Sequence, residues 1–179
     1  MAGRLCGALR LLEEGKEGIV VAEPDLWAEL ERVRQKLEAE AGGSGRVRKP
    51  NRYEAGVKRV RSLMYAAVSS GFVLAAHQGW LVNEGRHSSG QASIPDVQVL
   101  AFKHDQYRCY GGYLSYGSKR TFVCIEADNA KKQNKADYAL LERVAKRLGA
   151  LMADAAKTPL KTDEEWPVRV AAAAAPPGH

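Results

Sequence analysis

The segment that most constrains the fold is KRTFVCIEAD, residues 119–128. Aromatic and β-branched side chains fill it, and it stays apolar from Phe122 to Ile125. A segment of this kind predicts a strand that buries most of its side chains. The sheet that contains this strand must be covered by helices, so the chain is expected to form a layered, mixed α/β domain.

Two helices are predicted before the sheet and one after it. Pro24 and Asp25 mark the start of the first helix. Apolar side chains at helical spacing define all three helices. These stripes are Leu26, Leu30, Val33 and Leu37; then Tyr53, Val57, Val60, Met64 and Val68; and last Tyr138, Leu141, Val144, Leu148 and Leu151.

The remaining apolar segments predict strands. They are 19–23, 72–76, 80–82, 97–102, 106–117 and 166–170. Within the aromatic segment 106–117, Gly111-Gly112 is expected to form a turn or bulge. Residues 83–93 are expected to be a loop. From residue 51 this gives an α+β fold, a small mixed sheet flanked by helices in an αβββαβ-like order. Residues 1–50 are interpreted as a helical extension with a basic linker, 51–171 as the main domain and 172–179 as a disordered tail.

Composition indicates a basic globular domain. Of the 179 residues, 45% are hydrophobic and 27% charged, and the net charge is +6. Residues 51–150 contain 15 Lys and Arg against 8 Asp and Glu. This balance favours an anionic partner, nucleic acid first, although it serves solubility equally well.

The cysteines and the N-terminus predict the compartment. Cys6, Cys109 and Cys124 lack the spacing of a metal site and cannot all pair, which favours a reducing, cytoplasmic environment. The first residues do not read as a signal peptide, because Arg10 interrupts the apolar run. No segment is long enough to span a membrane, so no membrane partner is expected.

Three carboxylates stand at the ends of predicted strands. Asp96 precedes the strand 97–102, while Glu126 and Asp128 share one face at the end of 119–128, together with Phe122 and Cys124. If the two strands pair, Asp96 approaches Glu126. Converging carboxylates repel one another, and a bound Mg²⁺ or Mn²⁺ relieves that repulsion and can activate water for phosphodiester cleavage. Without a metal, Asp96 caps a turn and the other two are exposed.

A helix carrying Glu54, then IPDVQVL, then TFVCIEAD and a basic helix resembles the PD-(D/E)xK nuclease superfamily, its small Holliday-junction-resolvase-like members above all. The resemblance covers about residues 51–170. It implies a Mg²⁺ site with Asp96 and Glu126 as ligands and Glu54 as an accessory acid, and we keep Asp128 as a further candidate ligand. Asp128 stands where the family normally carries its lysine. The candidates for that catalytic lysine are therefore Lys131, Lys132 and Lys135, from the following helix.

The basic segment 129–147 supports a second resemblance. With the preceding strands it is similar to the C-terminal half of a RelE/ParE-type toxin, in which antiparallel strands lead into a basic loop and a final helix. Ribonucleases of that family act without metal through Lys, Arg and Tyr. The resemblance implies such roles for Lys103, Arg108, Lys132 and Tyr138. The strand 19–23 and two helices would precede the sheet, whereas residues 71–94 have no counterpart.

Three functions therefore remain open: a metal-dependent nuclease acting on DNA or RNA, a metal-independent toxin-like ribonuclease, and a basic subunit that binds nucleic acid without cleaving it. The residues expected to bind nucleic acid are Lys103, Arg108, Arg120, Arg143 and Lys146. The helix around Leu26 to Leu37 is a candidate surface for a homodimer or a protein partner.

Overall fold

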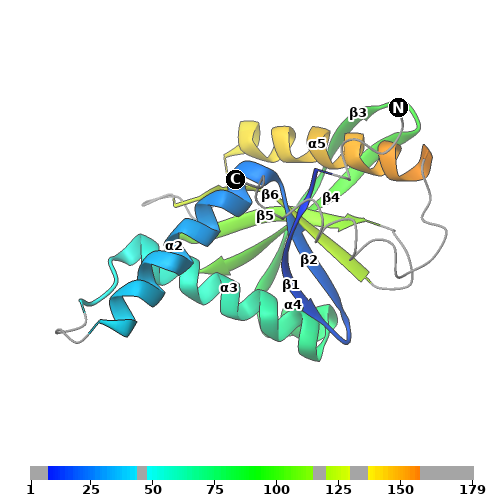
Figure 1. Cartoon of the computed structure of the whole chain (residues 1–179). Coiled ribbons are helices and arrows are strands. Elements are labelled where there is room, and N and C mark those ends of the chain that lie inside the picture. Colours follow the sequence, from blue (N-terminus) through cyan, green and yellow to red (C-terminus); the bar gives the residue numbers. More distant parts are fainter. Residues whose placement is uncertain (1–7, 44–47, 115–119, 130–136, 158–179) are drawn as a thin grey trace, which may run out of the picture.

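The computed structural model describes residues 8–43, 48–114, 120–129 and 137–157, which form one sheet with helices on both faces (Figure 1). In chain order the elements are β1 (Arg10–Gly15), β2 (Gly18–Ala22), α2 (Pro24–Gly42), α3 (Arg52–Ser70), α4 (Phe72–His77), β3 (Leu81–Gln91), β4 (Ile94–His104), β5 (Tyr107–Leu114), β6 (Arg120–Asp128) and α5 (Tyr138–Lys157). The expected mixed α/β, α+β class is confirmed.

The sheet has the strand order β1-β2-β6-β5-β4-β3. Strands β3 to β6 follow one another antiparallel, and β1 pairs antiparallel with β2. The pairing of β2 with β6 is parallel, from Gly18 opposite Arg120 to Ala22 opposite Cys124. A parallel pair needs a long connection, which α2 and α3 begin.

Two hydrophobic cores lie on opposite faces of the sheet. Residues of α2, α3 and α4 pack with Phe102, Phe122 and Cys124 on one face. The buried side of α5 packs with Val99, Tyr110 and other residues on the opposite face. Figure 1 shows α5 on one side of the sheet and the other described helices across from it. Strand β6, at the centre, is covered from both sides.

The N-terminal segment contributes to this same core. Every residue of β2 is buried, and Leu26, Leu30 and Val33 of α2 pack with α3 on the sheet. Residues 10–42, which the sequence analysis set apart as an extension, thus supply two strands and a helix to the sheet and its cover. Among the described helices, none combines the length and apolar character that crossing a membrane requires.

Several predicted elements lie where expected. The strands at 19–23, 97–102 and 119–128 correspond to β2, β4 and β6, and the three predicted helices correspond to α2, α3 and α5. The start of α3 has a local cause: the Asn51 side chain accepts from the Glu54 backbone N–H, and the Glu54 carboxylate accepts from the Asn51 N–H. The predicted strand 166–170 and tail 172–179 lie outside the described residues.

Two secondary-structure predictions are wrong. Residues 72–76 form the short helix α4, because Phe72 and Ala75 pack together into the core at helical spacing. Residues 83–93 were expected to be a loop but belong mostly to β3, an edge strand that pairs with β4. Asn, Gly and Ser have a low strand propensity, so the sequence of this segment does not indicate a strand. The strand forms because its backbone hydrogen-bonds to β4.

A β-bulge changes which face the end of β6 presents. Tyr110 lies opposite Glu126, but its neighbour Gly111 lies opposite Cys124, so Ile125 is the extra residue. Beyond the bulge, Glu126 faces α5, whereas Cys124 packs on the α2–α3 face. The prediction that Glu126 and Asp128 share a face with Phe122 and Cys124 is therefore wrong.

The bulge predicts a strict requirement for glycine. A Cβ on Gly111 would lie 1.8 Å from the Val123 carbonyl oxygen, so the two strands would have to separate. Gly111→Ala is expected to lower the free energy of unfolding by about 3 kcal/mol in urea denaturation. Gly42→Ala is the control, because nothing lies within 4 Å of that Cβ, and its effect should stay under about 1 kcal/mol. Equal effects of the two variants would contradict this account of the bulge.

Candidate functional site

Two rows of cross-strand neighbours form the candidate site at one end of the sheet. In the first row, Lys103 of β4 lies opposite Arg108 of β5, which lies opposite Asp128 of β6. In the second row, Ala101, Tyr110 and Glu126 occupy the same three strands. Both rows face α5, because Ala101 and Tyr110 pack in the core beneath that helix. We call the first row the basic row.

The tight turn between β4 and β5 positions the basic row. His104 pairs with Tyr107, which leaves Asp105 and Gln106 as a two-residue connection, and Asp105 has a φ of 53°. Arg52 of α3 donates to both Asp105 carboxylate oxygens, at 2.9 and 3.1 Å, and so ties the turn to the helical layer. Lys103 and Arg108 are the next pair of residues inward from this turn.

Arg108 is the buried cation of the site, with 7% of its surface exposed. Burial raises the pKa of the neighbouring Tyr110, while the Arg108 guanidinium opposes that rise and the carboxylates of Glu84 and Asp128 add to it. The Tyr110 hydroxyl therefore lies within the electrostatic reach of Arg108, Asp128 and Glu84. A guanidinium held in a low-dielectric environment interacts strongly with a phosphate placed beside it.

Helix α5 reaches the second row through an ion pair. Arg143 Nη2 donates to Glu126 Oε1 at 2.6 Å, and Arg143 Nε lies 3.4 Å from Glu126 Oε2. Glu126 raises the pKa of Arg143 through this contact. At the start of α5, Tyr138 is 67% exposed and makes an edge contact with the His87 ring on β3, 5.7 Å between centroids.

The structure brings only part of the predicted metal-ligand set together: Glu126 and Asp128 share a face of β6, but Asp96 does not join them. Strand β5 separates β4 from β6, so the pairing that would bring Asp96 to Glu126 does not occur. Asp96 lies opposite Ser88, five residues along β4 from Ala101. Because Ala101 is in the same row as Glu126, Asp96 is about 16 Å along the strand from the level of Glu126. In the described ranges, no group of three or more His, Cys, Asp and Glu side chains is arranged to hold a metal ion.

Glu54 has a structural role on the other side of the sheet. Its carboxylate, 3% exposed, accepts from Lys36 Nζ at 2.8 Å and from Arg48 Nη2 at 2.8 Å, besides the Asn51 N–H. It thereby joins α2, the preceding segment and the start of α3. These contacts, that of Lys36 first, lower the pKa of Glu54 to about 2.

The remaining predicted nucleic-acid contacts are dispersed. Arg120 is at the opposite end of β6, eight residues or about 26 Å from Asp128. Lys146 is exposed on α5. Lys131, Lys132 and Lys135 lie outside the described residues, between Asp128 and the start of α5. Lys103, Arg108 and Arg143 are thus the predicted cations that gather at one place.

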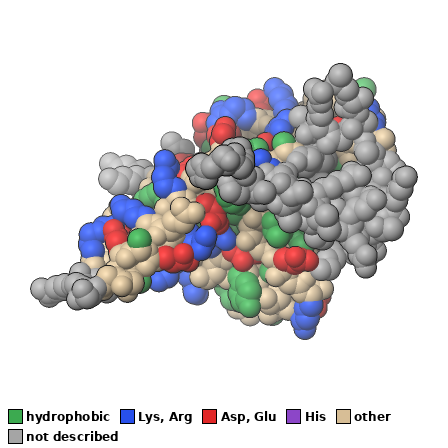
Figure 2. All heavy atoms as spheres, in the orientation of Figure 1, with side chains coloured by type: hydrophobic (Ala, Val, Ile, Leu, Met, Phe, Trp, Pro, Cys, Tyr) green, Lys and Arg blue, Asp and Glu red, His purple; other side chains and the backbone are tan. Residues whose placement is uncertain are grey.

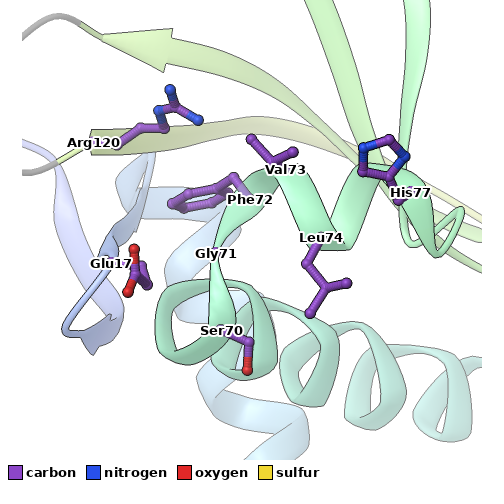
Figure 3. Close-up of a pocket in the computed structure, with 8 residues that line it drawn as sticks. All are labelled: Glu17, Ser70, Gly71, Phe72, Val73, Leu74, His77 and Arg120. Atoms are coloured by element: carbon purple, nitrogen blue, oxygen red, sulfur yellow. The ribbon is translucent and has the colours of Figure 1, made fainter.

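Arg120 belongs to a separate pocket of about 660 Å³ between α4 and the β1–β2 turn (Figure 3). Its lining is Glu17, Ser70, Gly71, Phe72, Val73, Leu74, His77 and Arg120. Figure 3 shows Phe72 between Glu17 and Arg120, and the guanidinium also lies 5.3 Å from the Tyr113 ring centroid. The pocket therefore does not extend the basic row.

Surface charge alone does not mark the site. In Figure 2, Lys and Arg side chains are interspersed with Asp and Glu over α2. Several of these charges are paired, as Arg34 is with Glu31 and Glu38. The surplus of positive charge therefore does not form one continuous patch on that face.

No family model matches the chain, and no match was found among curated proteins or among solved structures. The fold and the contacts within it are therefore the basis for the proposals that follow.

His87 lies in the segment 83–93 that was expected to be a loop, and the structure places it on β3, opposite Val97. That position is six residues, or about 20 Å, along β4 from the level of Lys103 and Arg108. Tyr110 was noted only as part of an aromatic run, because its place beside Arg108 depends on the β5 register.

The Glu54 contacts predict a specific acid sensitivity. Because the pKa of Glu54 falls from 4.5 to about 2 on folding, its contribution to stability is complete above pH 4.5 and is lost as the pH falls toward 2. Glu54→Gln should lower the melting temperature by several degrees at pH 7, and its difference from the wild type should vanish near pH 2. Circular dichroism melts at both pH values test this.

Glu38→Gln is the matched control, since Glu38 is 62% exposed on its side chain and pairs with Arg34 on the surface of α2. Its melting temperature should follow the wild type at both pH values. A Glu54→Gln deficit that persists at pH 2 would contradict the role given to the Glu54 charge.

Proposed function

We propose that the chain is a metal-independent ribonuclease in which Lys103 and Arg108 bind the phosphate that is cleaved. The observation that carries the proposal is the basic row, which lies on the α5 side of the sheet, next to the β4–β5 turn. A buried guanidinium and a partly exposed ammonium side by side suit a phosphate with two non-bridging oxygens.

The order of the elements supports the same proposal. The RelE/ParE resemblance implies a strand, two helices, consecutive antiparallel strands, a basic loop and a final helix. The described order is β1 and β2, then α2, α3 and α4, then β3 to β6, then α5, which agrees with that order apart from the additional elements β1 and α4. Residues 71–94, which had no counterpart in that resemblance, contain α4 and most of β3. The resemblance itself remains a proposal.

Cleavage of RNA without a metal uses the 2′-hydroxyl as the nucleophile. The 2′-oxygen attacks phosphorus, the bond to the 5′-oxygen breaks, and the products are a 2′,3′-cyclic phosphate and a 5′-hydroxyl. Negative charge grows on the non-bridging oxygens in the transition state. Arg108, fixed in place by burial, and Lys103, which can follow the substrate, would stabilise that charge.

The other two functions predict different behaviour. A Mg²⁺-dependent nuclease stops in chelator, and a binding subunit shows salt-sensitive affinity without cleavage. Of the carboxylates proposed for Mg²⁺, Glu126 and Asp128 lie in neighbouring rows of the site, whereas Asp96 and Glu54 lie elsewhere in the described structure, and we therefore prefer metal-free chemistry. A ribonuclease would meet its substrate in the cytoplasm, the compartment that the cysteines predict.

The test is cleavage of end-labelled RNA in EDTA and in Mg²⁺, for the wild type, Arg108→Lys and Lys103→Met. Equal wild-type rates are expected in both buffers. Arg108→Lys should lower kcat/KM by about 100- to 1000-fold, because a lysine cannot present the same fixed donors. Lys103→Met should lower it by about 10-fold or more.

Arg59→Ala is the control, since Arg59 is exposed on α3, across the sheet from the basic row. Arg59→Ala removes one positive charge, as Lys103→Met does, and it should leave kcat/KM unchanged. Melting temperatures confirm that each variant is folded. Loss of all activity in EDTA, or full activity in Arg108→Lys, would overturn the proposal.

A further inference from the structure

The outer side of α4 is apolar, although it faces solvent. Among the described residues, the large apolar side chains that are exposed are Tyr65, Val73, Leu74 and Tyr138, and all but Tyr138 lie within residues 65–74. Val73 is 60% exposed and Leu74 is 43% exposed. Phe72 and Ala75 occupy the buried side of this helix, which leaves Val73 and Leu74 on the outside. Exposed apolar side chains that are grouped in this way mark an interaction surface.

The same surface is hollowed and carries one charge of each sign. The pocket of about 660 Å³ beside α4 includes Glu17, from the β1–β2 turn, and Arg120, from the start of β6. In Figure 3 the Phe72 ring lies between these two side chains. It keeps the two charges apart, although Gly18, the residue after Glu17, is paired with Arg120 in the sheet. We call Glu17, Val73, Leu74 and Arg120 the α4 surface.

Both charged residues are held in place before any partner binds. The Glu17 N–H donates to the Val68 carbonyl at 2.9 Å, which fastens the β1–β2 turn to α3. A Cβ on Gly15 would lie 2.4 Å from that same carbonyl oxygen, so the turn packs directly on the helix. The Arg120 guanidinium lies over the Tyr113 ring, 5.3 Å from its centroid. Groups that are positioned in advance lose less conformational entropy on binding.

Lys16 is the neighbour that competes for Glu17. Its Nζ lies 3.8 Å from Glu17 Oε1, and the two side chains are 77% and 47% exposed. Ion pairs between such exposed side chains contribute little to stability. Glu17 can therefore exchange Lys16 for an arginine of another molecule at little cost.

The arrangement of the charges selects a partner that carries the same surface. An acidic partner would meet a like charge at Glu17, and a basic partner would meet one at Arg120. A two-fold axis through the apolar part instead places Glu17 of each copy opposite Arg120 of the other. Val73 and Leu74 of the two copies then pack together. An apolar centre with charged residues at its rim is the usual anatomy of a protein interface.

The position of the α4 surface agrees with this partner. Helix α2 was the candidate for a homodimer contact, but Leu26, Leu30 and Val33 of its stripe are buried against α3 and the sheet. The α4 surface lies on the opposite face from the basic row, and Arg120 is eight residues, about 26 Å, along β6 from Asp128. A second copy bound there leaves the basic row uncovered.

We propose that the α4 surface is the contact through which two copies of this chain form a symmetric dimer. The inference is independent of the proposed function. The dimer contains the ion pair between Glu17 and Arg120 twice, once on each side of the axis. Val73 and Leu74 of both copies form the apolar centre between the two ion pairs.

The test measures molar mass by sedimentation velocity over a series of protein concentrations. The wild type should form a dimer whose fraction rises with concentration. Glu17→Arg and Arg120→Glu should each weaken the dimer by about 10-fold or more, because each variant brings like charges together twice. An equimolar mixture of these two variants should recover the wild-type affinity, since the reversed charge of one then faces the reversed charge of the other. Val73→Asp should weaken the dimer in either mixture.

Arg86→Glu is the matched control, because Arg86 is exposed on β3, at the far edge of the sheet from β1. This variant should dimerise as the wild type does, and melting temperatures show that each variant is folded. A wild type that stays monomeric at every concentration would overturn the proposal, as would a dimer that Glu17→Arg and Val73→Asp leave intact. Loss of the dimer in both charge variants without recovery in their mixture would overturn it too, because the two side chains would then not face each other.

Discussion

The parallel ladder between β2 and β6 is the constraint on which the rest of the structure depends. Five residue pairs join the two strands, and the Glu23 N–H extends the ladder by donating to the Cys124 carbonyl at 3.0 Å. A parallel partner must be reached by a crossover, so α2 and α3 have to lie against one face. The four-stranded antiparallel run then returns the chain to β6, and α5 covers the opposite face.

Ion pairs secure the elements that this crossover brings together. Arg61 of α3 binds Glu13 of β1 and Glu31 of α2 with its side chain 14% exposed, and it also donates to the Leu12 carbonyl. On the other face, Arg147 of α5 binds Glu23 at 2.6 Å, just where β2 leads into α2. Each layer of helices is therefore tied to the N-terminal hairpin or to the residue that follows it. At the end of the sheet that carries the basic row, Arg52 of α3 binds Asp105 of the β4–β5 turn, and Arg143 of α5 binds Glu126.

The sequence was most informative where one pattern dominated. Helices α2, α3 and α5 follow from apolar stripes, and β6 follows from its run of apolar and β-branched residues. Only the start of β3 was predicted, at 80–82, because the rest of this edge strand is paired through its backbone and tolerates Asn, Gly and Ser. The orientation of Glu126 could not be predicted either, since a single extra residue at Ile125 reverses the alternation. The prediction that Asp96 approaches Glu126 assumed that their two strands are neighbours. In the structure β5 lies between these strands, and strand order is not encoded in local sequence patterns.

In the candidate site, too, the residue types could be predicted from the sequence, but their arrangement could not. Lys103 and Arg108 could be chosen from the sequence as cations on neighbouring strands, and their direct pairing depends on the two-residue turn at Asp105. The chemistry proposed here is therefore assembled by long-range pairing, although each of its residue types is ordinary.

The most direct measurement of the central claim is the chemistry of the cut ends. An RNA oligonucleotide would be incubated with the protein in EDTA, beside a copy that carries a single 2′-deoxynucleotide at the cleaved position, and the products analysed by mass spectrometry. The account predicts a 2′,3′-cyclic phosphate and a 5′-hydroxyl from the first and no cut at that position in the second. Cleavage at the 2′-deoxy position, leaving a 5′-phosphate and requiring Mg²⁺, would contradict it.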